Sequence, residues 1–182
     1  MTQAPLMDRI HITEDYDVPR VINGGWQLSA GHALERPLDL ADASRAFNRL
    51  IDMGFDTFDC ADIYTGVEDF FGGIIRERRK AGLRLPQIHT KFVPDLNDLA
   101  NVTPAYVENI ITRSLRRLGV ERLDAVQFHW WDYSVPGMVD VAGELVRLQE
   151  KGLIRLISTT NFNAVELRKL IDAGIPVATN QC

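Results

Sequence analysis

Four polar side chains, each at or just after the end of an expected strand, could together form a proton-donating site. Asp59 ends the apolar run Phe55–Asp59, and Tyr64 follows in the same loop. Lys91 and His129 end two later runs of the same kind. A carbonyl that accepts a hydride develops negative charge on its oxygen, so the reaction needs a proton donor placed against that oxygen. An acid, a phenol, an ammonium and an imidazole at successive strand ends suit such chemistry.

The charges of these groups suggest a role for each. A free phenol has a pKa near ~10, too high for easy donation at neutral pH, and an adjacent ammonium lowers it. Lys91 can supply that ammonium, and Asp59 would keep it charged by pairing with it. We therefore predict Tyr64 as the general acid, with a lowered pKa. In the alternative, Asp59 and Lys91 form only a structural ion pair.

Several neighbouring residues are given structural roles. Asp62 is expected to cap a turn, and Glu68 to begin a helix where acids are favoured, so both are left out of the site. Cys60 is expected to be a small buried side chain. Trp130 and Trp131 could be core or the apolar wall of a substrate pocket.

Strands and helices alternate along the chain. Strands are expected at residues 20–22, 55–59, 87–91, 123–129, 154–158 and 175–181, and helices at 41–53, 67–80, 104–118, 139–151 and after Asn163. This order requires parallel strands joined by crossover helices. No Gly-x-Gly-x-x-Gly follows the first strand, so a (β/α) barrel is favoured over a doubly wound sheet. Residues 10–18 are expected to form a hairpin at the barrel floor, and the basic run 76–80 a solvated helix end.

Composition limits the class of protein. The chain has 182 residues, a net charge of −5 and two cysteines, and no apolar run could span a bilayer. No secretory signal is visible at the N-terminus. We predict one soluble, cytoplasmic domain over residues 1–182, with no metal site and no nucleic-acid or membrane partner.

The chain resembles the aldo-keto reductase family. The resemblance rests on Asp59-x-Ala61-x-x-Tyr64, Lys91, His129, Thr160-Asn161-Phe162 and Asn180-Gln181. It implies a (β/α)8 TIM-type barrel that reduces an aldehyde or ketone with NADPH, with NADH as the alternative cofactor. It implies that Tyr64 is the acid and that His129 orients the carbonyl. It also implies that Thr160, Asn161 and Gln181 hold the nicotinamide carboxamide, although the family more often has serine where Thr160 stands.

The family continues through two more strands than this sequence contains. We therefore predict an incomplete barrel of about six β/α units, weak cofactor binding, and self-association or complementation through the open edges. Three alternatives to the reductase remain open at this point. The chain could be a nicotinamide-binding regulatory subunit without turnover, an inactive fragment, or an aldolase-like barrel that uses Lys91 as a Schiff-base amine.

Overall fold

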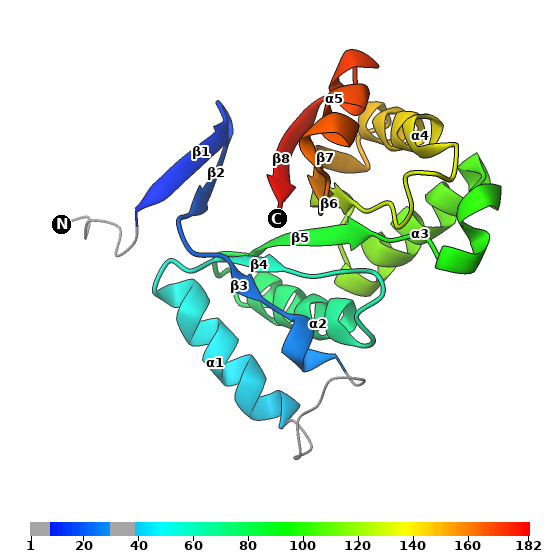
Figure 1. The fold of residues 1–182 in the computed structure, drawn as a ribbon. Coiled ribbons are helices and arrows are strands. Elements are labelled where there is room, and N and C mark those ends of the chain that lie inside the picture. Colours follow the sequence, from blue (N-terminus) through cyan, green and yellow to red (C-terminus); the bar gives the residue numbers. More distant parts are fainter. Residues whose placement is uncertain (1–7, 30–38) are drawn as a thin grey trace. The chain divides into compact units, whose positions relative to one another are not determined.

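The computed structural model describes residues 8–29 and 39–182 of the chain (Figure 1). Within it the chain forms two compact units. Among these residues, the first unit contains 8–29, 39–89 and 117–119, and the second contains 90–116 and 120–182.

The described residues form a two-stranded hairpin, followed from residue 23 onward by parallel strands that alternate with helices. The strands are β1 (Arg9–Thr13), β2 (Tyr16–Pro19), β3 (Asn23–Gly24), β4 (Thr57–Asp59), β5 (Gln87–Phe92), β6 (Leu123–Phe128), β7 (Ile154–Thr160) and β8 (Val177–Gln181). The helices are α1 (Leu40–Asp52), α2 (Val67–Lys80), α3 (Pro104–Leu118), α4 (Met138–Glu150) and α5 (Ala164–Asp172), with short 3-10 helices η1 (Trp26–Leu28) and η2 (Leu96–Asn101). The six strands β3 to β8 form one sheet in chain order. Because neighbours in sequence are neighbours in the sheet, each helix returns the chain to begin the next parallel strand, as predicted.

An aromatic cluster holds β4 in place in the first unit. The ring of Phe47, from α1, lies 5.1 Å from Phe58 in β4 and 5.4 Å from Phe71 in α2, measured between ring centroids. Phe58 and Phe71 stack on each other at 5.3 Å, and both are fully buried. Aromatic pairs at these separations favour a fixed relative geometry. The strand that ends in Asp59 is therefore fixed by side chains from both neighbouring helices.

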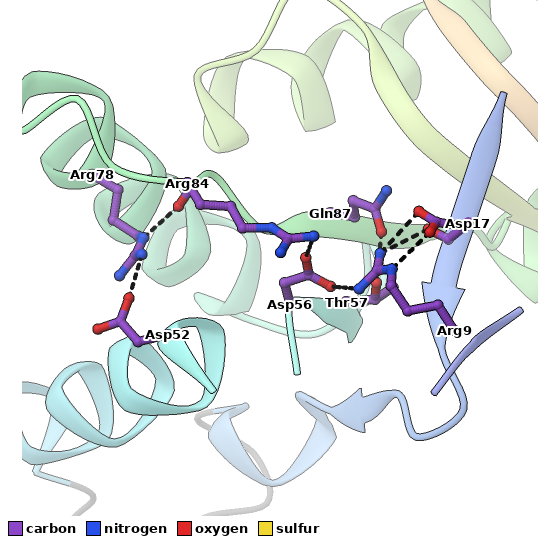
Figure 2. A network of polar contacts seen from close by, with 8 residues as sticks. All are labelled: Arg9, Asp17, Asp52, Asp56, Thr57, Arg78, Arg84 and Gln87. Atoms are coloured by element: carbon purple, nitrogen blue, oxygen red, sulfur yellow. Dashed lines mark hydrogen bonds and ion pairs between the residues drawn. The ribbon is translucent and has the colours of Figure 1, made fainter. Parts of the chain in front are cut away.

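The predicted N-terminal hairpin is confirmed, since β1 and β2 pair antiparallel. Figure 2 shows the ion pairs that attach it to the residue before β4. Arg9 donates from Nη1 to Asp56 at 2.8 Å and from Nε to Asp17 at 2.8 Å. Asp56 is almost fully buried and also pairs with Arg84 at 2.5 Å. A buried carboxylate is stable only when paired in this way. Asp56 thus links the hairpin to the segment between α2 and β5.

The first core strand lies later than predicted. Residues 20–22 are not a strand, and β3 is Asn23–Gly24, which pairs with Phe58 and Asp59. The apolar side chains of Val21 and Ile22 are 50% and 38% exposed, so they do not mark a buried strand. Pairing with β4, rather than local hydrophobicity, decides which residues form the strand.

The basic run at residues 76–80 is a solvated helix end as expected, except at one position. Arg78 is only 3% exposed. Its guanidinium donates to the carbonyl oxygen of Arg84 at 2.6 Å, to Asn48 at 2.8 Å and to Asp52 at 2.7 Å. Position 78 follows Phe71 by seven residues and therefore shares the buried face of α2. Burial is tolerated because each side of the guanidinium has an acceptor.

The second unit has its own core around Phe128 at the end of β6. Its ring lies 6.0 Å from Phe92, 5.8 Å from Trp130 and 5.6 Å from Phe162.

The predicted helix starts are confirmed at two positions. Thr103 accepts from the amide of Tyr106 at the start of α3, and Asn163 accepts from the amide of Glu166 at the start of α5.

Candidate active site

The first unit carries Asp59 and Tyr64 on the segment that leaves β4. The carbonyl of Asp59 accepts from the amide of Gly25 at 2.8 Å. A Cβ on Gly25 would lie only 3.0 Å from that carbonyl oxygen and 2.9 Å from the side chain of Val67, so the close approach needs glycine. The following loop is closed by two backbone bonds. The amide of Tyr64 donates to Ala61 at 3.1 Å, and the amide of Val67 donates to Tyr64 at 3.0 Å.

The phenol of Tyr64 is not acidified within this unit. The pKa of Tyr64 is raised from 10.0 to about 12. Burial contributes most to this rise, and the negative charges of Asp59 and Cys60 add to it. The lowered pKa that we predicted from the sequence is therefore wrong for the state described. The physical reason is that desolvation and a nearby carboxylate both disfavour a phenolate. The group consequently keeps its proton at neutral pH.

Two acids near Tyr64 are buried, which was not predicted from the sequence: Asp62 lies in the same loop, and Glu68 lies in the first turn of α2, as expected. Asp62 is 4% exposed and Glu68 is fully buried. Arg117 donates from Nη1 to the carbonyl oxygen of Asp62 at 3.0 Å and to the carboxylate of Glu68 at 3.1 Å. One local signal was available, because Glu68 precedes the buried Phe71 by three residues and so lies on the buried face of α2. The charged partner, 49 residues away, was not predictable from local sequence.

The second unit carries Lys91 and His129 on β5 and directly after β6. Lys91 is 6% exposed, and β5 extends one residue beyond it. The amide of His129 donates to the carbonyl oxygen of Phe92 at 3.0 Å, which joins the two segments. The rings of Trp131 and His129 pack perpendicular to each other, with centroids 4.4 Å apart. Both side chains therefore lie in sheltered positions at strand ends.

His129 is held in its neutral form. Burial is the first cause that lowers its pKa; the bond to the carbonyl of Thr160 opposes this, and the positive charge of Lys91 lowers the pKa further. Nδ1 lies 3.3 Å from that carbonyl oxygen, which can only accept, so the contact favours a proton on Nδ1. In the neutral ring Nε2 is then an acceptor. Nε2 is buried and has no hydrogen-bond partner among the described residues.

The three residues assigned to the nicotinamide carboxamide lie together in the second unit. The amide of Asn161 donates to the carbonyl oxygen of Gln181 at 2.7 Å, and the hydroxyl of Thr160 donates to the side-chain oxygen of Gln181 at 3.3 Å. Asn161 has a positive φ of 62°, a conformation that asparagine tolerates better than most residues. It does not begin α5, because Asn163 caps that helix. The side chains of Asn161 and Gln181 are exposed, and an amide offers both donors and acceptors, so the set fits a carboxamide ligand.

The cysteine and the two tryptophans near the strand ends differ in burial. Cys60 is confirmed as a fully buried free cysteine. Trp130 is buried in the core, whereas Trp131 is 48% exposed and donates to the carbonyl oxygen of Pro94 at 2.8 Å. In residues 8–29 and 39–182, no group of histidine, cysteine or acidic side chains could hold a metal ion. No helix in these ranges is long and apolar enough to cross a membrane.

Two parts of the predicted site are thus each assembled within one unit. In the first unit, the negative charge of Asp59 helps to raise the pKa of Tyr64. In the second unit, the positive charge of Lys91 helps to lower the pKa of His129. His129 also contacts the carbonyl oxygen of Thr160, which lies beside Asn161 and Gln181. The first part holds a proton on oxygen, and the second presents a positive charge and an imidazole.

Comparison with known proteins gives a consistent result. The model of the Aldo/keto reductase family matches residues 20–182. Methylglyoxal reductase DkgA of Yersinia pestis is 29% identical to the chain, with 100% of the chain and 58% of that protein aligned. An aldo-keto reductase of Mycobacterium sp. (strain KMS) is 30% identical, with 98% of the chain and 58% of that protein aligned. The chain therefore spans less than two thirds of the length of these relatives.

Solved structures share the fold. A thermostable aldo-keto reductase crystallised with the inhibitor epalrestat superposes with a TM-score of 0.77 at 21% identity, over 96% of this chain and 61% of that one. A Bombyx mori aldo-keto reductase in complex with NADP gives a TM-score of 0.76 at 23% identity, over 96% of this chain and 57% of that one. This likeness confirms the parallel β/α fold class predicted from the sequence.

Proposed function

Since this chain belongs to the Aldo/keto reductase family, we propose that it contributes the proton-donating site of an enzyme that reduces an aldehyde or ketone to an alcohol. The observation that carries the proposal is the half-buried phenol of Tyr64, which keeps its proton at neutral pH and follows Asp59 by one loop. A proton held on oxygen at the end of a barrel strand is what a carbonyl oxygen needs as it gains negative charge.

Tyr64 is the general acid in this proposal, and Lys91 and Asp59 support it. The positive charge of Lys91, brought near the phenol, stabilises the phenolate left after proton transfer. Asp59 keeps that ammonium charged. Within its own unit the phenol has a pKa of about 12. The lysine therefore lowers the cost of a transfer that burial alone would make difficult.

His129 contacts the reacting oxygen through Nε2. With its proton on Nε2 the ring donates to the carbonyl and orients it. With its proton on Nδ1, the form favoured by the carbonyl of Thr160, it accepts from the hydroxyl of the alcohol product. The buried, unpartnered Nε2 supports this assignment, because a buried ring nitrogen ordinarily has a hydrogen-bond partner.

Thr160, Asn161 and Gln181 would hold the carboxamide of a nicotinamide cofactor, and NADPH, when bound, supplies the hydride. The NADP in the Bombyx mori structure and the family membership support NADPH over NADH. The exposed amides of Asn161 and Gln181 support the binding role, since together they match the donors and acceptors of a carboxamide.

Small aldehydes are the proposed substrates, and the name of the Yersinia pestis relative makes methylglyoxal the first to test. The experiment follows NADPH oxidation by the purified protein with a panel of small aldehydes and ketones, and identifies the alcohol formed. Lys91→Met and Asp59→Asn should reduce turnover at saturating substrate. Absence of NADPH oxidation with every carbonyl tested would reject the proposal.

Three further expectations stay predictions. They are a single domain over residues 1–182, a cytoplasmic location, and self-association or complementation through open strand edges. Sedimentation velocity over a range of protein concentrations would test the last, because self-association raises the mean sedimentation coefficient as concentration increases.

A further inference from the structure

An ion pair between a buried carboxylate and a partly exposed arginine contacts the loop that carries Tyr64. The carboxylate of Glu68, in the first turn of α2, is fully buried. Its Oε2 accepts from Nη1 of Arg117 at 3.1 Å, and the same nitrogen donates to the carbonyl oxygen of Asp62 at 3.0 Å. Arg117 thus binds at once to the helix that follows the loop and to the backbone of the loop itself.

The backbone bonds that follow this contact in the loop are local, whereas before it the amide of Cys60 donates to the carbonyl oxygen of His89 at 2.8 Å. Tyr64 bonds back to Ala61, and Val67 bonds back to Tyr64, each over three residues. Such short-range turns fix the shape of a loop but not its place against the rest of the fold. The bond from Arg117 spans 55 residues, so it ties the loop to a distant segment of the same unit. It meets the backbone two residues before the phenol.

The packing of α2 permits this reach. A Cβ on Gly72 would lie 2.1 Å from the carbonyl oxygen of Arg117, so only glycine allows the two backbones to approach so closely. Gly72 follows Glu68 by one helical turn, on the same face of α2. The glycine brings the backbone of Arg117 against the helix, and the side chain then extends past Glu68 to the loop.

We propose that Arg117, anchored by Glu68, is a positioning residue that sets the place of loop 60–66 and hence of the Tyr64 phenol. The inference rests on the proposed function, because the phenol is the proton donor there. A proton donor must lie within hydrogen-bond reach of the reacting oxygen, and a displacement of about 1 Å can reduce turnover by about a hundredfold.

Arg117→Lys tests the inference. Lysine keeps the positive charge, but its ammonium lies one bond closer to the backbone than Nη1 of arginine, so it does not reach the carboxylate of Glu68 and the loop carbonyl together. We expect kcat to fall roughly ten- to a hundredfold while the dissociation constant of NADPH changes by less than about twofold. We also expect faster amide hydrogen exchange at residues 61–66, with exchange in the middle of α2 unchanged.

Arg79→Lys is the matched control. Arg79 lies in the same unit and also donates to a backbone carbonyl at the end of α3, that of Gly119 at 3.0 Å, but it does not contact the loop. This variant should leave kcat and loop exchange unchanged. Circular dichroism first establishes that each variant is folded. If Arg117→Lys is not folded, Glu68→Gln takes its place, because its amide oxygen still accepts from Arg117 without the charge that anchors it.

The two readouts separate this inference from the proposed function. If the wild-type protein turns over and a folded variant shows unchanged kcat or unchanged loop exchange, the positioning role is overturned. Failure of both variants to fold, with Arg79→Lys folded, would assign the pair to global stability and overturn it as well. If the wild-type protein turns over no carbonyl, the proposed function fails, and the exchange data alone still decide whether Arg117 holds the loop.

Discussion

Gly72 and Gly73 are adjacent in α2, yet the structure predicts opposite effects when each is replaced by alanine. A Cβ on Gly72 would lie 2.1 Å from the carbonyl oxygen of Arg117, whereas a Cβ on Gly73 would meet nothing within 4 Å. The obstacle at Gly72 is backbone, which cannot rotate away as a side chain can. Ordinary contacts begin at 3.4 Å, so the segments would have to separate by roughly 1 Å.

The two magnitudes follow from these contacts. Alanine in place of glycine inside a helix is favourable by about 1 kcal/mol, and Gly73→Ala should realise that gain. Gly72→Ala has the same gain but adds an overpacking cost of about 3 kcal/mol, the upper end of the usual range. We therefore expect a net loss of about 2 kcal/mol for Gly72→Ala and a difference of about 3 kcal/mol between the variants.

Equilibrium unfolding in urea, followed by circular dichroism, measures both values on the same protein. The midpoint should fall for Gly72→Ala and rise for Gly73→Ala, with similar slopes. If Gly72→Ala is as stable as Gly73→Ala, then α2 does not pack against the backbone of Arg117 as described. That result would also remove the packing argument for the reach of Arg117 to the loop.

Two further predictions concern titrating groups. The hydrogen bond from Arg9 lowers the pKa of Asp17, so the pair stabilises the fold above the ordinary pKa of an aspartate, and this contribution is lost as the pH falls through the lowered value. Acid unfolding curves of wild type and Arg9→Met should therefore converge at low pH; parallel curves would contradict the pairing. For Tyr64, a pKa raised from 10.0 to about 12 means that the unfolded chain releases its proton first, so stability should decline between these pH values. Tyrosinate formation can be followed by ultraviolet absorbance in wild type and in Tyr64→Phe, and the difference between the two curves reports Tyr64 alone. That difference should be centred near pH 12, and a difference centred near pH 10 would refute the burial of the phenol.

Much of the fold was predictable because local signals agree with it. Helix α2 begins and ends at the predicted residues, Val67 and Lys80. Gly66 precedes it in a left-handed conformation, and its apolar stripe repeats at helical spacing. Caps at Thr103 and Asn163 marked two more helix starts. Where a turn residue and a hydrophobic period indicate the same boundary, the sequence alone is sufficient.

Two of the errors share one physical cause, which is a partner distant in sequence. Arg78 was assigned to solvent because Asp52, which accepts from it, lies in another helix. Glu68 begins a helix as predicted, but its burial was not predicted because its partner Arg117 is 49 residues away. The pKa of Tyr64 was predicted to fall because the charge of a lysine was considered and the burial of the phenol was not. Residue types at strand ends identified the candidate site, but burial and pairing depend on the tertiary fold.

The central claim is that the phenol of Tyr64 delivers the proton to the carbonyl oxygen. The most direct measurement compares Tyr64→Phe with wild type in steady-state reduction of a small aldehyde, together with NADPH affinity by fluorescence titration. Tyr133→Phe is the control, since that phenol is also partly buried and bonds to the carbonyl oxygen of Asn161. We predict that Tyr64→Phe lowers kcat by about a hundredfold or more with NADPH affinity unchanged, and that Tyr133→Phe retains kcat. Equal kcat for Tyr64→Phe and wild type would contradict the account.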